Sequence, residues 1–330
     1  MQNSPFLSIV IPVYNGAKVI NRCLNSIWQQ GLEESTYEVI CVNDCSTDNT
    51  EQVIKQTQKS HANLRLLSNP TNKRAGGSRN YGVKEAEGKY IVFIDADDYF
   101  HISALKQVIE YLSKTKLDIL VCDFARHTID APNNKLVHNF KSTKIMSGRA
   151  FMITNSLPYA PWKYIFKKNL MIYNNCFFEE CVSCEDVDWT HKIAFFASKM
   201  QYQPILLTHY ILEPNSQTGA EYKNSRSVFN RIYSGYRLMQ LLKYCNTIDE
   251  ETYIKKVATS TYENGLLFFN GLSISPKKKS AIISKYVITD QVSGLLGFAT
   301  KYPMLYSIIS SIISPLFSTL IKVRRFITGR

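Results

Sequence analysis

The sequence lacks the long apolar runs that would place it across a membrane. None of its stretches forms the clean apolar run of 18 residues that indicates a transmembrane helix. The first residues carry neither the basic segment nor the apolar core of a secretory leader. Internal repeats and low-complexity tracts are absent, and hydrophobic residues make up 45% of the chain. We therefore expect a globular, cytoplasmic protein with a sizeable core.

Two common kinds of site are also absent. The apolar run Leu7–Val13 is followed by Tyr14-Asn15-Gly16 rather than by a glycine-rich loop. This absence excludes the usual dinucleotide fingerprint of dehydrogenases and disfavours a nucleotidyltransferase, which would need a phosphate-binding loop there. Cys181 and Cys184 have no second pair at zinc-site spacing, and several other cysteines fall in apolar runs. We expect reduced, buried thiols rather than disulfides.

Acidic residues are scarce in the last third of the chain. Residues 226–330 contain 15 Lys and Arg against 5 Asp and Glu, whereas residues 1–225 contain 24 against 22. A diffuse nucleic-acid binder would more often carry its excess charge on the main domain, so we expect no nucleic-acid partner. The basic C-terminal region points instead to an anionic membrane surface.

The first hundred residues alternate between strand and helix patterns. Short apolar runs predict four strands, and helical spacing predicts helices between them. The predicted strands are Leu7–Val13, Tyr37–Val42, Leu64–Leu67 and Tyr90–Ile94. Such alternation predicts an α/β fold with a mostly parallel sheet and helices on both faces. Ligands bind at the carboxyl ends of the strands in sheets of this kind.

Three carboxylates follow the fourth predicted strand. Asp95, Asp97 and Asp98 lie within four residues of one another at the end of a fully apolar run. Divalent cations such as Mg²⁺ prefer oxygen ligands and are often held by one or two carboxylates together with substrate phosphates. The alternative is an acidic turn that caps the next helix. The position at a strand end favours the metal site.

Asp44 follows the second predicted strand, within Asn43-Asp44-Cys45-Ser46-Thr47-Asp48. A buried carboxylate at this place would accept a hydrogen bond from the imide N–H of a nucleobase and reject a base without that donor. The alternative is that Asp44 and Ser46 cap the next helix. Both roles are compatible, because Ser46 or Asp48 suffices as a cap.

Several short motifs, each of them weak alone, follow one another between Leu7 and Thr218. They are Ile11-Pro12-Val13-Tyr14-Asn15, the Asp44 turn, Arg79-Asn80 with Gly82, Phe93-Ile94-Asp95-Ala96-Asp97-Asp98, Pro161-Trp162-Lys163, and Glu185-Asp186. In their order and spacing the chain resembles the family 2 glycosyltransferases, which have the GT-A fold with a Rossmann-like nucleotide-binding sheet.

The resemblance implies a donor site and a metal site. Pro12, Tyr14 and Asp44 would line the pocket for the base and ribose, with Asp44 on the uracil imide. Arg79 would approach the donor. Asp95 and Asp97 look like the family's DxD acids, and Asp97 would hold Mn²⁺ or Mg²⁺ against the diphosphate of a UDP-sugar.

The resemblance also implies a base and an acceptor region. Asp186 would remove the proton of the acceptor hydroxyl in a single displacement with inversion, although Glu185-Asp186 also suits the acidic first turn of a helix. Asp98, Glu185 and Trp162 are candidates for support or acceptor contact, and Trp162 is as readily explained by packing. Cys45 stands where the family usually has glycine, which suggests a slightly different turn.

The family's Gln-x-x-Arg-Trp element of processive synthases is missing after Glu185-Asp186. We therefore expect transfer of a single sugar to a glycan or lipid-linked hydroxyl in cell-surface polysaccharide synthesis. A nucleotidyltransferase and an inactive membrane-associated partner are the alternatives. The expected parts are a nucleotide-sugar-binding half (1–100), an acceptor-binding half (101–225) and a basic helical extension (226–330).

Within this extension, residues 303–326 show helical spacing of apolar residues, a serine-rich opposite face and a basic end. This pattern predicts an amphipathic helix on the anionic inner leaflet, which would make the enzyme peripheral on the cytoplasmic face. The alternative is a helix packed on the protein's own core.

Overall fold

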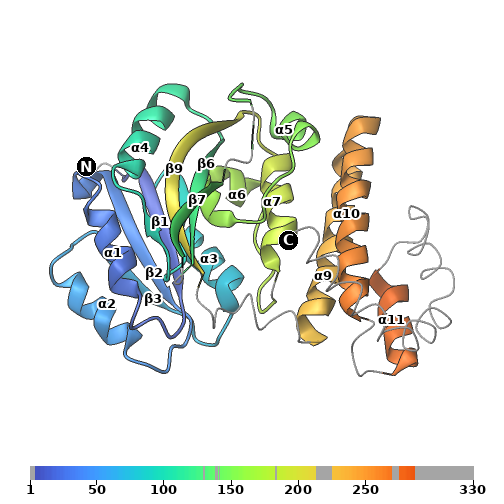
Figure 1. Ribbon diagram of the computed structural model, residues 1–330, viewed down its shortest axis with the longest axis horizontal. Helices are drawn as coiled ribbons and strands as arrows, with labels where there is room; N and C mark the ends of the chain where they lie inside the picture. Colours follow the sequence, from blue (N-terminus) through green and yellow to red (C-terminus); the bar gives the residue numbers. More distant parts are fainter. Residues whose placement is uncertain are drawn as a thin grey trace. The chain divides into compact units, whose positions relative to one another are not determined.

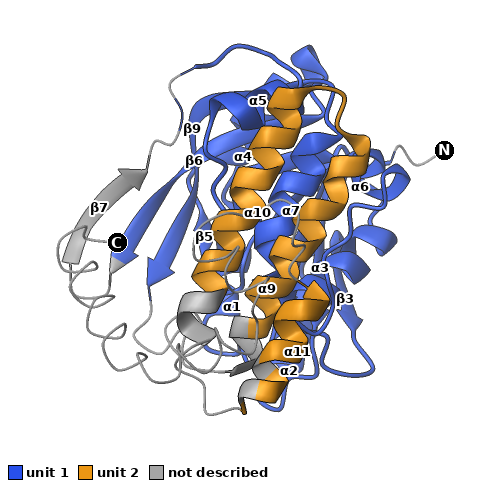
Figure 2. Cartoon of the chain, turned by 90° about the vertical axis from the view of Figure 1, so that its right-hand side faces the viewer, with its two compact units in different colours: residues 1–216 blue, residues 217–330 orange. Residues whose placement is uncertain are grey.

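The computed structural model describes residues 4–128, 131–137, 140, 142–182, 184–212, 225–269 and 275–286. The chain separates into two compact units, residues 1–216 and residues 217–330, which are coloured separately in Figure 2. Among the described residues, no helix combines the length and apolar character needed to cross a bilayer. The amphipathic helix predicted over 303–326 lies outside the described residues.

The first unit is built on a nine-stranded sheet whose strands run in the order β3-β2-β1-β4-β8-β6-β9-β5, with β7 paired to β6. The strands β1 to β4 pair in parallel, whereas β8 is antiparallel to both β4 and β6. The strands are β1 Leu7–Val13, β2 Tyr37–Asn43, β3 Leu64–Ser68, β4 Tyr90–Phe93, β5 Tyr99–Phe100, β6 Ile119–Thr128, β7 Ala131–Val137, β8 Tyr164–Lys167 and β9 Met200–Leu212.

Helices cover both faces of this sheet (Figure 1). Buried residues of α1, α2 and α4 pack with Ile9 and Ile11 on one face. On the other face, α3 approaches Val10, and Trp189 of α7 packs edge-on against Phe93. The helices are α1 Ile20–Trp28, α2 Thr50–Gln58, α3 Arg74–Glu85, α4 Ala104–Thr115, α5 Gly148–Thr154, α6 Lys168–Tyr173 and α7 Glu185–Phe195. The predicted α/β class, with a mostly parallel sheet and helices on both faces, is confirmed.

The helix α3 starts earlier than its sequence suggests. The polar, glycine-containing stretch 68–77 is typical of a loop, yet the helix begins at Arg74. A Cβ on Gly76 would lie 2.8 Å from the carbonyl oxygen of Glu179 and 2.9 Å from Cγ of Glu185. The glycine is therefore required by close packing rather than by a loop.

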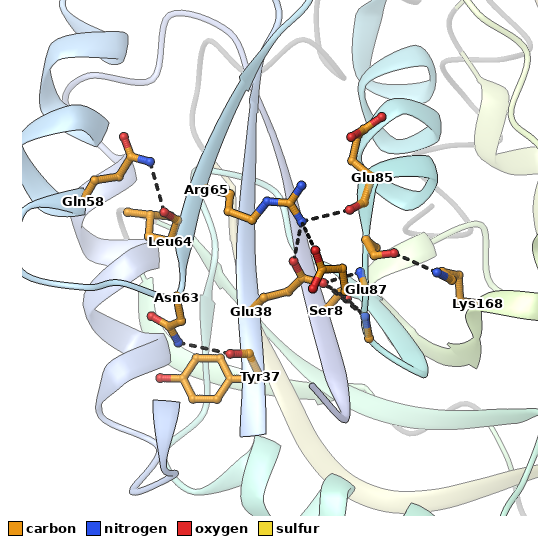
Figure 3. A network of polar contacts seen from close by, with 12 residues as sticks. Ser8, Tyr37, Glu38, Gln58, Asn63, Leu64, Arg65, Glu85, Glu87 and Lys168 are labelled. Carbon is orange, nitrogen blue, oxygen red and sulfur yellow. Dashed lines mark hydrogen bonds and ion pairs between the residues drawn. The ribbon is translucent and has the colours of Figure 1, made fainter. Parts of the chain in front are cut away.

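The amino ends of the parallel strands share a buried polar network (Figure 3). Glu38 of β2 accepts hydrogen bonds from Ser8 Oγ at 2.7 Å, from the backbone N–H of Glu87 at 2.5 Å and from that of Gly88 at 3.1 Å. Its other carboxylate oxygen lies 2.8 Å from Nη1 of Arg65 in β3. Both oxygens of this buried carboxylate are thus satisfied, and the network joins three strands and the turn before β4.

The second unit is helical over its described residues. It contains α9 Ser225–Met239, α10 Ile248–Phe269 and α11 Pro276–Tyr286. Gly235 of α9 faces the ring of Tyr262 in α10, and the hydroxyl of Tyr262 donates to the carbonyl oxygen of Tyr286 at 2.9 Å. The helical C-terminal region expected from the sequence is therefore present, and it is organised around buried aromatic contacts.

Candidate active site

The acidic loop follows β4 at the carboxyl edge of the parallel strands. Asp95 and Asp97 are partly buried, and Asp98 is fully buried. One oxygen of Asp98 accepts a hydrogen bond from the backbone N–H of Ile211 at 2.9 Å, and the other has no hydrogen-bond partner among the described residues. Burial raises the pKa of Asp98 well above its usual range, and the charges of Asp95 and Asp97 raise it further.

Arg79 of α3 connects the acidic loop to the start of α7. Its guanidinium lies 2.7 Å from an oxygen of Asp95 and 2.9 Å from an oxygen of Glu185. Burial lowers the pKa of Arg79, but the charges of Asp95 and Glu185, with a smaller contribution from Asp186, raise it overall. Three carboxylates that lie far apart from Arg79 in sequence, those of Asp95, Glu185 and Asp186, therefore surround its positive charge.

The helix α7 presents its amino end to this cluster. Glu185, Asp186 and Asp188 occupy its first turn, where the helix dipole favours negative charge. The backbone carbonyl of Asp186 accepts a hydrogen bond from Thr190 Oγ1 at 2.8 Å. The carboxylate expected to act as base thus belongs to a regular helix and not to an irregular loop.

Asp44 lies at the neighbouring strand end, almost fully buried. One of its oxygens accepts from Asn69 Nδ2 and from the backbone N–H of Lys73, each at 2.8 Å. These bonds fix the loop that leads into α3. Cys45 has a φ of 62°, in the left-handed region that favours glycine, which explains why glycine is usual at this position.

Pro12 and Tyr14 differ in exposure. Pro12 is buried in β1 opposite Val42, one residue before the strand ends. Tyr14, directly after the strand, is 46% exposed. The turns after β1 and β2 are tied together, because the backbone N–H of Asn15 donates to Ser46 Oγ at 2.9 Å. Tyr14 therefore stands beside the Asp44 turn with surface available for a ligand.

Trp162 is packed rather than open. Its indole stacks on Tyr210 of β9 with ring centroids 5.5 Å apart, and it meets the edge of Phe124 at 4.7 Å. Only 7% of Trp162 is exposed. These contacts favour the packing interpretation of Trp162, and direct stacking on an acceptor sugar stays a prediction.

Residues outside the sequence motifs also adjoin the acidic loop. Arg22 of α1 donates to the backbone carbonyl of Asp97 and lies over the ring of Tyr99 at 5.8 Å. Nδ1 of His209 lies 2.6 Å from Nε2 of His127, and its Nε2 lies 2.9 Å from Nδ1 of His101. No sequence signal identified these histidines as a group, because they come from β6, β9 and the turn after β5.

These residues could hold a divalent cation only if the substrate supplied further oxygen ligands. No group of three or more His, Cys, Asp or Glu side chains among the described residues is arranged as a complete metal site. Asp95 pairs with Arg79, and Asp97 follows two residues later in the same loop. This set fits a cation such as Mg²⁺ or Mn²⁺ that is held by few carboxylates and by phosphate oxygens.

The family model for glycosyl transferase family 2 matches residues 8–179, more than half of the chain. The chain therefore belongs to glycosyltransferase family 2, and it is a glycosyltransferase.

Two curated relatives illustrate the range of the family. The uncharacterized glycosyltransferase YibD of Escherichia coli (strain K12) is 25% identical over 254 residues, which are 74% of this chain and 72% of YibD. TarS of Staphylococcus aureus (strain MW2), described as a poly(ribitol-phosphate) beta-N-acetylglucosaminyltransferase, is 29% identical over 58% of this chain. The match spans only 33% of TarS, so TarS carries much sequence with no counterpart in the match.

Solved structures agree with the fold. Residues 1–349 of S. aureus TarS in complex with UDP-GlcNAc match with a TM-score of 0.71 at 19% identity, covering 94% of this chain and 92% of that one. A mannosyltransferase from Pyrobaculum calidifontis, in complex with GDP-Man and Mn²⁺, matches with a TM-score of 0.55 at 15% identity over 94% of this chain and 87% of its own. The GT-A fold expected from the sequence is thereby confirmed.

Proposed function

We propose that this glycosyltransferase moves a single sugar from a UDP-sugar to an acceptor hydroxyl, with inversion at the anomeric carbon. The observation that carries this proposal is the convergence of Asp95, Glu185 and Asp186 around Arg79 at the carboxyl edge of the sheet. Sheets of this kind bind ligands at that edge. A single turnover needs one base and one site for the leaving diphosphate, and the cluster offers groups for both.

We assign the donor to the side of the site formed by β1 and β2. Tyr14 offers an exposed ring, and Pro12 and Asp44 complete the surface for the base and ribose. Asp44 already accepts two hydrogen bonds on one oxygen, and a carboxylate can accept further bonds on the other. An imide N–H of uracil is a suitable donor to that oxygen.

We assign Asp97, with Asp95, to a divalent cation. The cation would stabilise the negative charge that grows on the departing diphosphate. Asp98 supports the loop through its bond to the backbone of Ile211. Asp186 accepts the proton of the attacking hydroxyl, which lies on the face of the sugar opposite the leaving group.

We further propose that the acceptor is a glycan or lipid-linked hydroxyl of a cell-surface polysaccharide. The name of TarS, a poly(ribitol-phosphate) glycosyltransferase, supports this class of acceptor. The excess of 15 basic over 5 acidic residues in 226–330 supports contact with an anionic inner leaflet, which would make the enzyme peripheral on the cytoplasmic side. The division into a donor half (1–100), an acceptor half (101–225) and a basic extension (226–330) belongs to the same proposal.

Thermal unfolding in the presence of UDP-, GDP- and dTDP-sugars, with and without Mn²⁺, tests the donor assignment. A ligand that binds only the folded state raises the unfolding temperature. We expect UDP-sugars to raise it in a metal-dependent manner. Equal stabilisation by all three nucleotide classes, or none by any, would contradict the assignment.

A further inference from the structure

The turn after β1 is bonded to the turn after β2 through three successive backbone N–H groups. The N–H groups of residues 15–17 each donate to a side-chain oxygen of the second turn. The pairs are Asn15 with Ser46 Oγ at 2.9 Å, Gly16 with Thr50 Oγ1 at 2.8 Å, and Ala17 with Asp48 Oδ2 at 3.2 Å. These N–H groups are therefore satisfied within the protein, and none of them needs a substrate phosphate as its acceptor.

The side chain of Asn15 adds hydrogen bonds in the reverse direction. Its Oδ1 accepts from the backbone N–H of Thr47 at 2.8 Å and from Thr47 Oγ1 at 3.3 Å. The φ of Asn15 is 51°, in the left-handed region that most side chains avoid. Position 15 thus requires both a left-handed backbone and a side-chain oxygen. Asparagine and aspartate meet both requirements, whereas glycine meets only the first.

Each of the two turns carries one side of the proposed base site. Tyr14 is exposed and directly precedes Asn15, and Asp44 lies two residues before Ser46. The backbone N–H of Asp44 also donates to the carbonyl oxygen of Val13 at 2.8 Å. The bonds made by Asn15 therefore fix the position of Tyr14 relative to Asp44 before a ligand arrives. A site that is formed in advance loses less conformational entropy on binding.

We propose that Asn15 is a positioning residue of the donor site, which holds Tyr14 and Asp44 at the spacing that a uracil base requires. The inference rests on the proposed function, in which Tyr14 and Asp44 bind the base of a UDP-sugar. It assigns Asn15 to recognition of the base and leaves the diphosphate to the acidic loop. Loss of the contact should therefore weaken UMP and UDP alike, because the two nucleotides carry the same base.

Asn15→Gly and Asn15→Asp, titrated with UMP and with UDP in the presence of Mn²⁺, test this role. Glycine keeps the left-handed backbone but removes the acceptor for Thr47. We expect both Kd values to rise by about tenfold, the effect of losing one or two hydrogen bonds. Binding of GDP, which has no uracil, should change little. Aspartate keeps the acceptor oxygen, so its Kd values should stay within about threefold of wild type.

The aspartate variant separates positioning from direct contact. Aspartate has no amide N–H group, so an Asn15→Asp protein as weak as Asn15→Gly would make the amide itself a ligand of the nucleotide and overturn the proposal. A loss for UDP without a loss for UMP would place Asn15 at the diphosphate and overturn it too. Unchanged Kd values in Asn15→Gly would show that the contact between the turns is not needed.

Asn25→Gly is the matched control, because Asn25 is exposed on α1, where glycine lowers helix stability without reaching the two turns. Its Kd values for UMP and UDP should equal those of wild type, and a loss there would trace the effect to stability alone. Ser46→Ala removes the acceptor of the Asn15 N–H and should weaken both nucleotides by about threefold.

Should Asn15→Gly fail to fold, Ser46→Ala carries the test, and unchanged Kd values in that variant would contradict the proposal. Wild-type protein that binds neither UMP nor UDP would refute the proposed function itself. Wild-type protein that binds both, together with variants that bind equally well, would refute only the role of Asn15.

Discussion

The buried charged side chains at the two ends of the sheet differ in how completely their hydrogen bonds are satisfied. At the amino end, both oxygens of Glu38 have donors from the chain itself (Figure 3). At the carboxyl end, one oxygen of Asp98 and the Nε of Arg79 have no hydrogen-bond partner among the described residues. Native proteins rarely leave buried polar atoms unsatisfied without a functional reason.

This difference separates a structural network from a working site. Charges at the amino end stabilise the fold because their partners are complete. Charges at the carboxyl end are crowded, since the charges of Asp95 and Asp97 raise the pKa of Asp98, and such repulsion favours the binding of a cation. Substitutions at the two ends should therefore change different observables, stability at one and transfer at the other.

The largest effect should follow Asp186→Asn. Removal of a general base typically costs about 100- to 10,000-fold in rate, and the amide keeps the shape of the side chain. We expect kcat for sugar transfer to fall by that amount while donor Kd remains near wild type. Steady-state kinetics and donor titration measure the two quantities, and a variant with more than a tenth of wild-type kcat would remove Asp186 from the chemistry.

Glu38→Gln should lower stability and leave kcat unchanged, the reverse of the effect expected for Asp186→Asn. It removes a charge that accepts hydrogen bonds from Ser8 and Arg65, and bonds to charged groups contribute about 2 kcal/mol. We expect the free energy of unfolding in urea to fall by about that amount, with kcat unchanged. Glu87→Gln is the control, because Glu87 is 68% exposed and lies 3.9 Å from Arg65. A Glu38→Gln enzyme with normal stability and lost activity would break the comparison.

Gly76→Ala should affect both observables moderately. The new methyl group would press on the carbonyl of Glu179 and on Glu185. Overpacking of this kind costs about 1–3 kcal/mol, offset by about 1 kcal/mol from the higher helix propensity of alanine. We expect a small loss of stability and a larger relative loss of kcat, measured on one preparation. A stabilised and fully active variant would show that residues 178–185 need not be held closely.

The smallest expected effect is on the pH dependence of stability, and it involves His209. Burial, and then the neighbouring His127 and His101, lower the pKa of His209 to about 4; Arg22 and Tyr99 also adjoin this cluster. An unfolded histidine titrates near about 6.5, so the unfolded state binds the proton first and stability falls as pH drops from about 6.5 to about 4.

Substitution of this histidine isolates its contribution. We expect His209→Gln to lose less stability than wild type across that range, by on the order of 1 kcal/mol. Urea unfolding at pH 7.5, 6.0 and 4.5 measures the difference. Equal losses in the two proteins would show that His209 is not the group responsible.

The sequence predicted the parallel half of the fold better than the antiparallel half. Strands β1 to β4 are short apolar runs with helices between them, so local periodicity is sufficient. The strands β8 and β9 lie in a stretch rich in aromatic and polar residues, and their pairing depends on contacts with β4 and β6 that no local pattern records.

The candidate site, like the fold, combines residues that a local pattern predicts with contacts that no local pattern predicts. The acids at 95–98 stand out because they follow an apolar strand, and Asp186 stands out only through its family motif. The bridge from Arg79 to Glu185 joins residues 106 positions apart, and the histidine cluster joins three separate segments. Such contacts arise from the tertiary fold, which brings charges together without any regular spacing in sequence.

Titration of a UDP-sugar into Asp97→Ala and Asp186→Asn, side by side and in the presence of Mn²⁺, tests the central claim most directly. A metal clamp on a diphosphate is worth several kcal/mol. Asp97→Ala should therefore lose donor affinity by about 100-fold or more, whereas Asp186→Asn should bind as wild type does. Undiminished, metal-dependent binding by Asp97→Ala would contradict the account, as would loss of donor binding in Asp186→Asn.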